Sequence, residues 1–389
     1  MYSMKAESAF IIKNNHLKVI MSAFSIFKSA INQWILEKLR LIYYKLIQIH
    51  IYIQEYYIRP IILQNSIKHI YGLKKINYEK NELIVLCVVS NGELYIKSFI
   101  EHYFQLGVKH IVFLFNDSTD NSINIASQYE NITIIKTQCP YKKYETVMKR
   151  YLVYRFSKNK WNLFSDIDEL FDYPFSDLIN LSDLLNYLNK NKYTAVVLQM
   201  LDLFSDISLA SLTSKINDSL KERYIYYDIY NIEKETYPFG ELLNKNINLH
   251  WGGIRKTLFD TNNGLTKAAL VFVDSKIRTF VYCHHVKNAR IADFTGVLLH
   301  YPFTSIFYQK VKEAVETKRY LQSANHEYKM YLEKLQHDPD INIKQGTACL
   351  FKNVNYLLEN NFIVVSDDYI QWVKNHTNSN SSEKKIKDI

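Results

Sequence analysis

The chain has 389 residues, a formal net charge of +9 and 48% hydrophobic residues, so it can bury a large core and is not a disordered polymer. Its nine glycines form neither G-x-G-x-x-G nor G-x-x-x-x-G-K-[ST], which argues against a dinucleotide fingerprint and a P-loop. Its four scattered cysteines contain no C-x-x-C pair, which disfavours a zinc ribbon and fits a reducing cytoplasm. No transmembrane helix is expected, because no uncharged apolar run reaches about 18 residues.

The positive charge is concentrated in the first fifth of the chain. Residues 1–80 carry twelve Lys and Arg against four Asp and Glu, and the remainder is nearly neutral. Apolar residues recur there at alternating spacings of four and three, which predicts one apolar stripe on a helix. The stripe comprises Ile35, Leu39, Ile42, Leu46, Ile49, Ile53 and Tyr56. We expect a basic helical extension over residues 1–80, which packs on the protein's own core or a second subunit, or lies on an anionic membrane surface. Nucleic-acid binding is not expected, because no aromatic–basic recognition module follows.

From residue 82 onward, short apolar runs alternate with helical patterns. We expect strands at 82–90, 108–115, 131–137 and 161–165, and helices at 94–106, 122–129 and 141–157. Such alternation predicts an α/β fold with a mostly parallel, twisted sheet flanked by helices. In folds of this kind, the loops at the carboxyl ends of the strands form the functional site.

The second half of the chain is less regular. Strands are expected at 193–201, 268–273, 278–282 and 297–300, followed by one long helix at 304–335. We place a main domain at 81–335, and at 336–389 a C-terminal helical segment with a polar tail that is partly disordered from Asn375.

The strongest candidate for chemistry is the run Asp166-Ile167-Asp168-Glu169 after the fourth strand. Three acids at a buried strand end repel one another unless a cation lies among them. Hard oxygen ligands suit Mg²⁺ or Mn²⁺, which usually keep coordination sites for substrate phosphates. The alternative is a solvated turn or a helix cap.

Further polar groups follow other predicted strands. The loop from Asn116 to Ser122 carries short side chains that bind a ribose or base edge, or that cap the next helix. The pair Gly252-Gly253 indicates a sharp turn or a close backbone approach. Arg255 and Lys267 are candidates for phosphate binding, with surface ion pairs as the alternative. His300 ends a predicted strand and is a candidate third metal ligand.

In their order along the chain, these segments resemble the family 2-type glycosyltransferases of the GT-A fold. The matching loops are Asn91-Gly92-Glu93, Asn116-Asp117-Ser118-Thr119-Asp120 and Asp166-Ile167-Asp168-Glu169. Gly252 to Arg255, Leu265 to Lys267, His284-His285 and Leu298 to Tyr301 then recur in the family's order. The resemblance covers about residues 83–335, and Gly92 is an insertion relative to the family's usual Asn-Glu.

The resemblance implies a role for each matching residue. The nucleotide-sugar would contact Asn91, Glu93, Asn116, Asp117, Asp120, Asp166, Arg255, Lys267 and His285. A Mn²⁺ or Mg²⁺ ion would be held by Asp166, Asp168 and His300. Asp202 is the candidate catalytic base on the acceptor side, with Glu169 and Glu241 as alternatives.

The implied activity is that of a metal-dependent inverting glycosyltransferase with a nucleotide-sugar donor, a UDP-sugar by family habit. A glycan or lipid-linked acceptor in surface polysaccharide synthesis, at the cytoplasmic membrane face, would suit the basic extension. The alternatives are a nucleotidyltransferase with a related fold and an inactive binding or scaffold module.

Overall fold

The computed structural model describes residues 33–213, 219–274, 276–277, 279, 284–320 and 322–387. The chain divides into two compact units, residues 1–65 and 66–389. All of the predicted strand at 278–282 except residue 279, and the first 32 residues of the predicted extension, lie outside the described residues.

The described part of the first unit is helical. It consists of α2 (Gln33–Ile53), the π-helical turn η1 (Gln54–Ile58) and α3 (Arg59–Ser66), whose last residue belongs to the second unit. Most of the predicted apolar stripe is solvent-exposed, including Ile42, Leu46 and Ile49 at 54%, 58% and 54%. The helical run ends earlier than predicted, because residues 68–71 form a strand of the sheet in the second unit. None of the described helices has the length and apolar character needed to cross a membrane.

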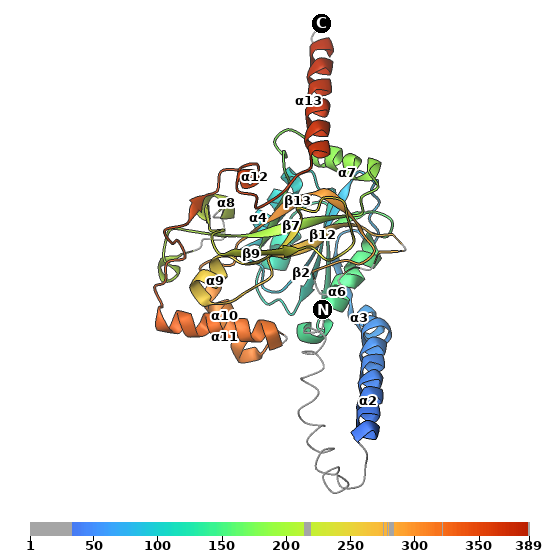
Figure 1. Cartoon of the computed structure of the whole chain (residues 1–389), viewed down its shortest axis with the longest axis vertical. Helices are drawn as coiled ribbons and strands as arrows, with labels where there is room; N and C mark the ends of the chain where they lie inside the picture. The colour runs from blue at the N-terminus through green and yellow to red at the C-terminus, as the bar shows by residue number, and fades with distance from the viewer. Residues whose placement is uncertain are drawn as a thin grey trace. The chain divides into compact units, whose positions relative to one another are not determined.

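The second unit is built on a twelve-stranded sheet formed by the described residues (Figure 1). Its main path runs β1 (Lys68–Tyr71), β4 (Ile132–Thr137), β3 (His110–Asn116), β2 (Leu83–Val89), β5 (Trp161–Phe164), β12 (Thr266–Phe272), β7 (Ala195–Phe204), β13 (Arg290–His300) and β10 (Glu241–Leu242). Strands β4, β3, β2 and β5 are parallel to one another, as are β7, β13 and β10. Strand β12 runs antiparallel between β5 and β7.

Shorter strands extend or accompany this sheet. β6 (Glu169–Asp172) pairs antiparallel with β13, and β8 (Tyr226–Tyr227) joins β7 to β14 (Cys349–Leu350). β9 (Ile232–Thr236) and β11 (Asn248–Gly252) form a separate two-stranded sheet. The predicted fold class, an α/β fold with a mostly parallel sheet flanked by helices, is confirmed.

The helices after β2 are α4 (Ile96–Gln105), α5 (Ser122–Ala126), α6 (Tyr141–Phe156), α7 (Leu181–Lys190), α8 (Leu220–Arg223), α9 (Ile254–Phe259), α10 (Phe307–Thr317), α11 (Gln322–His337), α12 (Tyr356–Glu359) and α13 (Asp367–Lys387). The sequence predicted the first three of them, whereas α7, α8, α9 and α12 were not predicted. Strands β2 and β3 are buried along their whole length, which explains their continuous apolar runs. Helix α6 packs on these two strands, and α4 packs on β6.

Two predicted C-terminal features differ from the structure. The single helix expected at 304–335 is two helices, because Lys318 adopts a left-handed conformation (φ 49°) and ends α10. The tail expected to be disordered from Asn375 is helical to Lys387 as part of α13. Two acids open that helix, and its buried Tyr369 stacks on Phe294 with ring centroids 4.4 Å apart.

Candidate active site

A cleft of about 700 Å³ lies at the carboxyl ends of β2, β3 and β5. This is the edge of the sheet where the sequence predicted the site. Eight predicted residues line it: Asn91, Glu93, Asn116, Asp120, Asp166, Asp168, Arg255 and His300. Five other predicted residues are not on its wall: Asp117, Glu169, Asp202, Lys267 and His285.

Hydrogen bonds from polar side chains connect the loops after β2 and β3. The Asn91 side-chain oxygen accepts the Thr119 amide at 2.8 Å, and Asp120 accepts the Glu93 amide at 2.8 Å. Asp120 also accepts the amide of Ser122, the first residue of α5, at 3.2 Å, whereas the N-cap residue Asn121 makes no side-chain capping bond. These loops form a fixed wall of the cleft, because each side chain holds the backbone of the other loop.

Two predicted residues of the second loop have structural surroundings of their own. The Asn116 side chain donates to the carbonyls of Thr137 and Cys139, so it ties the end of β3 to the segment after β4. Asp117 adopts a left-handed conformation (φ 52°) and is exposed, outside the cleft lining.

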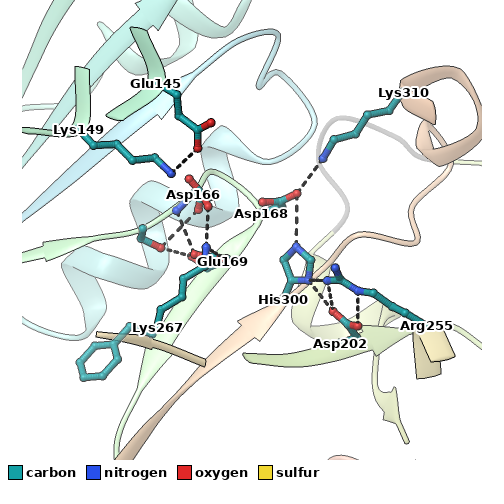
Figure 2. A network of polar contacts seen from close by, with 12 residues as sticks. Glu145, Lys149, Asp166, Asp168, Glu169, Asp202, Arg255, Lys267, His300 and Lys310 are labelled. Carbon is teal, nitrogen blue, oxygen red and sulfur yellow. Dashed lines mark hydrogen bonds and ion pairs between the residues drawn. The ribbon is translucent and has the colours of Figure 1, made fainter. Parts of the chain in front are cut away.

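The acidic run after β5 is a turn whose two aspartates face different cations (Figure 2). Lys267 of β12 lies 2.7 Å from Asp166 and 2.5 Å from Glu169. The Lys267 and Glu169 side chains are only 8% and 1% exposed. Lys267 was predicted to contact phosphate, but its ammonium is held by these two carboxylates. Nearby, the buried Lys149 of α6 lies 2.9 Å from Glu145.

The second aspartate belongs to a separate cluster around His300, which joins three elements. Strand register places His300 opposite Glu169 of β6 and beside Asp202 of β7. His300 Nδ1 lies 2.6 Å from Asp202, and His300 Nε2 lies 3.7 Å from Asp168. Lys310 of α10 approaches the same oxygen of Asp168 to 2.9 Å.

Arg255 completes the second cluster through Asp202. Its Nε and one terminal nitrogen each donate to Asp202 at 2.7 Å, a two-point contact with both carboxylate oxygens. The turn before α9 brings Arg255 here, and it depends on Gly252 and Gly253 with φ values of 86° and 64°. The sharp turn predicted from the Gly-Gly pair is confirmed.

The charges in this cluster stabilise one another's ionised forms. Burial would raise the pKa of Asp168, but Lys310 and His300 outweigh it and hold that pKa well below its usual range. Burial would lower the pKa of His300, but hydrogen bonds to Asp168 and Asp202 outweigh it and raise that pKa. For Glu169 burial dominates, so its pKa is raised despite the nearby Lys267.

Two carboxylates predicted as the catalytic base are already engaged. Both oxygens of Asp202 are occupied by Arg255, and one of them also contacts His300. Glu169 is buried against Lys267. Neither Asp202 nor Glu169 lines the cleft. The third alternative, Glu241, is exposed on β10 near Arg290. The arrangement suits Asp202 and Glu169 to positioning other groups.

The two histidines of the predicted pair have different surroundings. His284 lines the cleft, whereas His285 stacks on Phe239 with ring centroids 4.3 Å apart. The sequence predicted His285 as the residue that contacts the nucleotide-sugar, but its neighbour His284 is the one that lines the cleft.

Several cleft residues were not identified from the sequence. They include Glu145 and Lys149 of α6, Lys310 and Glu313 of α10, Arg319 and Tyr320 after it, and Glu327, Tyr328 and Tyr331 of α11. Tyr320 and Tyr328 stack with ring centroids 4.8 Å apart, so part of this wall is aromatic. None of these residues forms a local motif, and only the fold brings them to the acidic loop.

Comparisons with known proteins give weak similarities. No family model and no curated protein matches the chain. Among solved structures, S. aureus TarS 1–349 is 16% identical over 66% of this chain and 70% of that chain, with a TM-score of 0.28. A structure of S. aureus TarS is 17% identical over 65% of this chain and 43% of that chain, with a TM-score of 0.31. UDP-glucose pyrophosphorylase complexed with UDP-glucose is 7% identical over 77% and 99%, with a TM-score of 0.22. These values carry no argument about function, which therefore rests on the site itself.

Proposed function

We propose that this protein is an inverting glycosyltransferase that moves a sugar from a nucleotide-sugar donor, a UDP-sugar in our proposal, to a hydroxyl acceptor. One observation carries the proposal. Polar loops from three neighbouring parallel strands, the Asp168–His300 pair and several Lys and Arg side chains line one cleft of about 700 Å³. A cleft of this size suits a small-molecule ligand, and its mixed charges suit a diphosphate beside a cation.

The residues beside Asp168 fit a divalent cation such as Mn²⁺ or Mg²⁺. Asp168 offers a carboxylate oxygen and His300 offers Nε2 on the same side, while Nδ1 of His300 is fixed by Asp202. A carboxylate that orients a ligating histidine through its other nitrogen is a common support of metal sites. Within the described residues no group of three or more His, Cys, Asp or Glu could hold a metal ion, so substrate phosphates would complete the coordination. When bound, the cation would neutralise charge that develops on the leaving diphosphate.

The remaining residues of the site hold His300 and Asp166 in position. In this proposal Arg255 and Asp202 hold the His300 ring, and Lys267 and Glu169 hold Asp166 at the cleft wall. The hydrogen-bonded loops around Asn91, Glu93, Asn116 and Asp120 would receive the nucleoside, because these residues line that end of the cleft.

The acceptor hydroxyl needs a carboxylate on the cleft wall to take its proton. We assign this role to Glu327 of α11, which lines the cleft 3.8 Å from Arg255 and accepts the Tyr331 hydroxyl. Glu327→Gln should lower kcat by about 100-fold or more and leave donor affinity unchanged. An equal loss of donor affinity and turnover would reject Glu327 as the base.

Ligand binding tests the donor proposal without knowledge of the acceptor. We would record thermal unfolding with UDP, GDP, CMP and UDP-sugars, each with and without Mn²⁺. A ligand at one hundred times its Kd adds about 2.7 kcal/mol, a shift of a few degrees. UDP with Mn²⁺ should stabilise the wild type and the Asp117→Asn control, which alters an exposed residue outside the cleft. Asp168→Asn should lose the effect, and stabilisation by no nucleotide would refute the proposal.

We further propose that the basic extension places the enzyme at an anionic membrane, at the cytoplasmic face, where a lipid-linked acceptor or growing surface glycan would be reached. The exposed stripe of α2 and its Lys and Arg residues support this, since apolar area and positive charge together favour anionic bilayers. The full chain should sediment with phosphatidylserine vesicles at low salt. Leu46→Asp on the stripe should abolish sedimentation, whereas Tyr44→Asp, about 160° away around the helix, should not. Equal sedimentation of both variants with the wild type would reject the membrane assignment.

A further inference from the structure

Lys310 occupies the carboxylate that the proposed metal needs. Its ammonium lies 2.9 Å from Asp168 Oδ2, the same oxygen that His300 Nε2 approaches at 3.7 Å (Figure 2). We propose that Lys310 forms an ion pair with Asp168 in the free protein and contacts the diphosphate of the donor once the donor binds. The binding of the metal would then depend on the binding of the donor, and the reverse. The inference rests on the proposed function, because it assigns one further donor-binding residue to that site.

The helix that carries Lys310 is anchored, so the contact with Asp168 is built into the fold. Phe307, Val311 and Ala314 of α10 are buried in the core. Phe307 packs on Tyr331 of α11 with ring centroids 5.7 Å apart. These contacts hold one face of α10 in place and direct Lys310 into the cleft, which it lines.

Lys310 is better suited to change partners than Lys267, the other lysine that contacts the acidic loop. Lys267 is 8% exposed and lies between two carboxylates, so withdrawing it would leave a buried charge without its partner. Lys310 is 34% exposed and, among the described residues, pairs with Asp168 alone. A lysine side chain has four rotatable bonds and an easily re-solvated head, so a change of partner requires no movement of the helix.

A divalent cation bound to Asp168 Oδ2 would be repelled by the ammonium that already contacts this oxygen. Metal–oxygen bonds of Mg²⁺ are about 2.0–2.1 Å, which would bring the metal within about 5 Å of the ammonium. Repulsion then opposes metal binding in the free protein. A nucleoside diphosphate supplies oxygens that accept the displaced ammonium, so each ligand removes a barrier to the other. Such coupling is reciprocal by thermodynamic necessity.

The decisive experiment measures Mn²⁺ alone, because that measurement does not require a donor. We would titrate Mn²⁺ into the full chain and its variants and follow free Mn²⁺ by electron paramagnetic resonance. Lys310→Gln should bind Mn²⁺ at least about tenfold more tightly than the wild type. Lys312→Gln is the matched control, since Lys312 is exposed on the same helix and does not line the cleft. Lys310→Arg keeps the charge, and both of these variants should bind Mn²⁺ as the wild type does.

A Lys310→Gln affinity for Mn²⁺ equal to or weaker than that of the wild type would overturn the proposal. Thermal unfolding of each variant shows that it is folded, and Lys310→Arg provides a second test if Lys310→Gln is not. A Lys310→Arg affinity for Mn²⁺ that clearly exceeds the wild-type value would also overturn it.

A second readout separates this inference from the proposed function. Wild-type affinity for UDP should rise at least tenfold with saturating Mn²⁺, and this coupling should shrink in Lys310→Gln. Strong UDP binding with unchanged coupling in the variant would refute the role of Lys310 and leave the donor proposal intact. Tighter Mn²⁺ binding by the variant, with no UDP binding by any form, would support the ion pair of Lys310 with Asp168 and refute the donor proposal.

Discussion

Removing the Lys267 charge tests whether the acidic loop is held by an internal cation. Lys267→Met keeps most of the aliphatic volume but leaves Asp166 and Glu169 facing each other without the ammonium 2.7 and 2.5 Å away. Glu169 is 1% exposed, so water cannot replace the lost partner. Breaking a buried ion pair by removing one member costs about 3–5 kcal/mol.

The expected loss is large enough to read in a thermal scan. One kcal/mol shifts the unfolding midpoint by about 2–4 °C in domains of somewhat smaller size, so the variant should melt on the order of 10 °C lower. Urea unfolding should give the corresponding loss in the free energy of unfolding.

A double variant separates the ion pair from simple packing. Lys267→Met with Glu169→Leu removes both buried charges, and it should recover most of the lost stability. Asp166 is 31% exposed and can be solvated without Lys267. A change of less than about 1 kcal/mol in the free energy of unfolding of Lys267→Met, or a double variant less stable than the single one, would show that Lys267 does not stabilise the loop through its charge.

Three further changes probe the fold that supports the cleft. Burial lowers the pKa of His102 to about 3, so only the unfolded state gains a proton as pH falls below about 6.5, and stability should decline towards acid. His102→Gln should remove about 2 kcal/mol of the decline in the free energy of unfolding between pH 6.5 and 5. Urea unfolding of the variant should therefore depend less on pH, and an unchanged pH dependence would contradict a neutral buried His102. Gly253→Ala should cost about 1–3 kcal/mol and weaken donor binding, because φ is 64° at the turn before α9, and a fully stable variant would contradict this. Gly296→Ala should cost about 1–3 kcal/mol without changing donor affinity, because a Cβ there would lie 2.8 Å from Leu198 and 2.9 Å from Phe171, and a Gly296→Ala midpoint equal to the wild-type value would contradict it.

The part of the fold that local pattern determines was predictable from the sequence. The first four core strands are short apolar runs with helical segments between them, and each appears close to its expected position. The carboxyl ends of those strands also locate the cleft, because parallel strands bring their following loops to one edge. Asp168 and His300 were predicted as neighbours, and strand register brings them within 3.7 Å.

The cations of the site could not be predicted in the same way. The sequence argument held that three acids at a strand end need a metal, whereas the structure supplies Lys267 and Lys310 from distant elements. Lys267 was singled out, but its antiparallel strand β12 turns it onto the acidic loop. Lys310 lies on a helix with no motif, and only the tertiary placement of α10, which packs on α11, reveals its partner.

The irregular half of the chain shows a further limit of pattern reading. Asp202 was chosen as the base for its place in the sequence, but its two-point contact with Arg255 is a tertiary property. The long helix expected at 304–335 breaks at Lys318, which adopts a left-handed conformation although lysine has no intrinsic tendency to break a helix.

Turnover of a nucleotide-sugar tests the central claim most directly. We would incubate the full chain with Mn²⁺, a panel of UDP-, GDP- and CMP-sugars and simple sugar or lipid-phosphate acceptors, and separate the nucleotide products by chromatography. We expect that one donor, a UDP-sugar, yields its nucleoside diphosphate and a glycosylated product, and that Asp168→Asn abolishes both. Pyrophosphate release from a nucleoside triphosphate and a sugar phosphate, with no nucleoside diphosphate from any nucleotide-sugar, would contradict the account and identify nucleotidyl transfer instead.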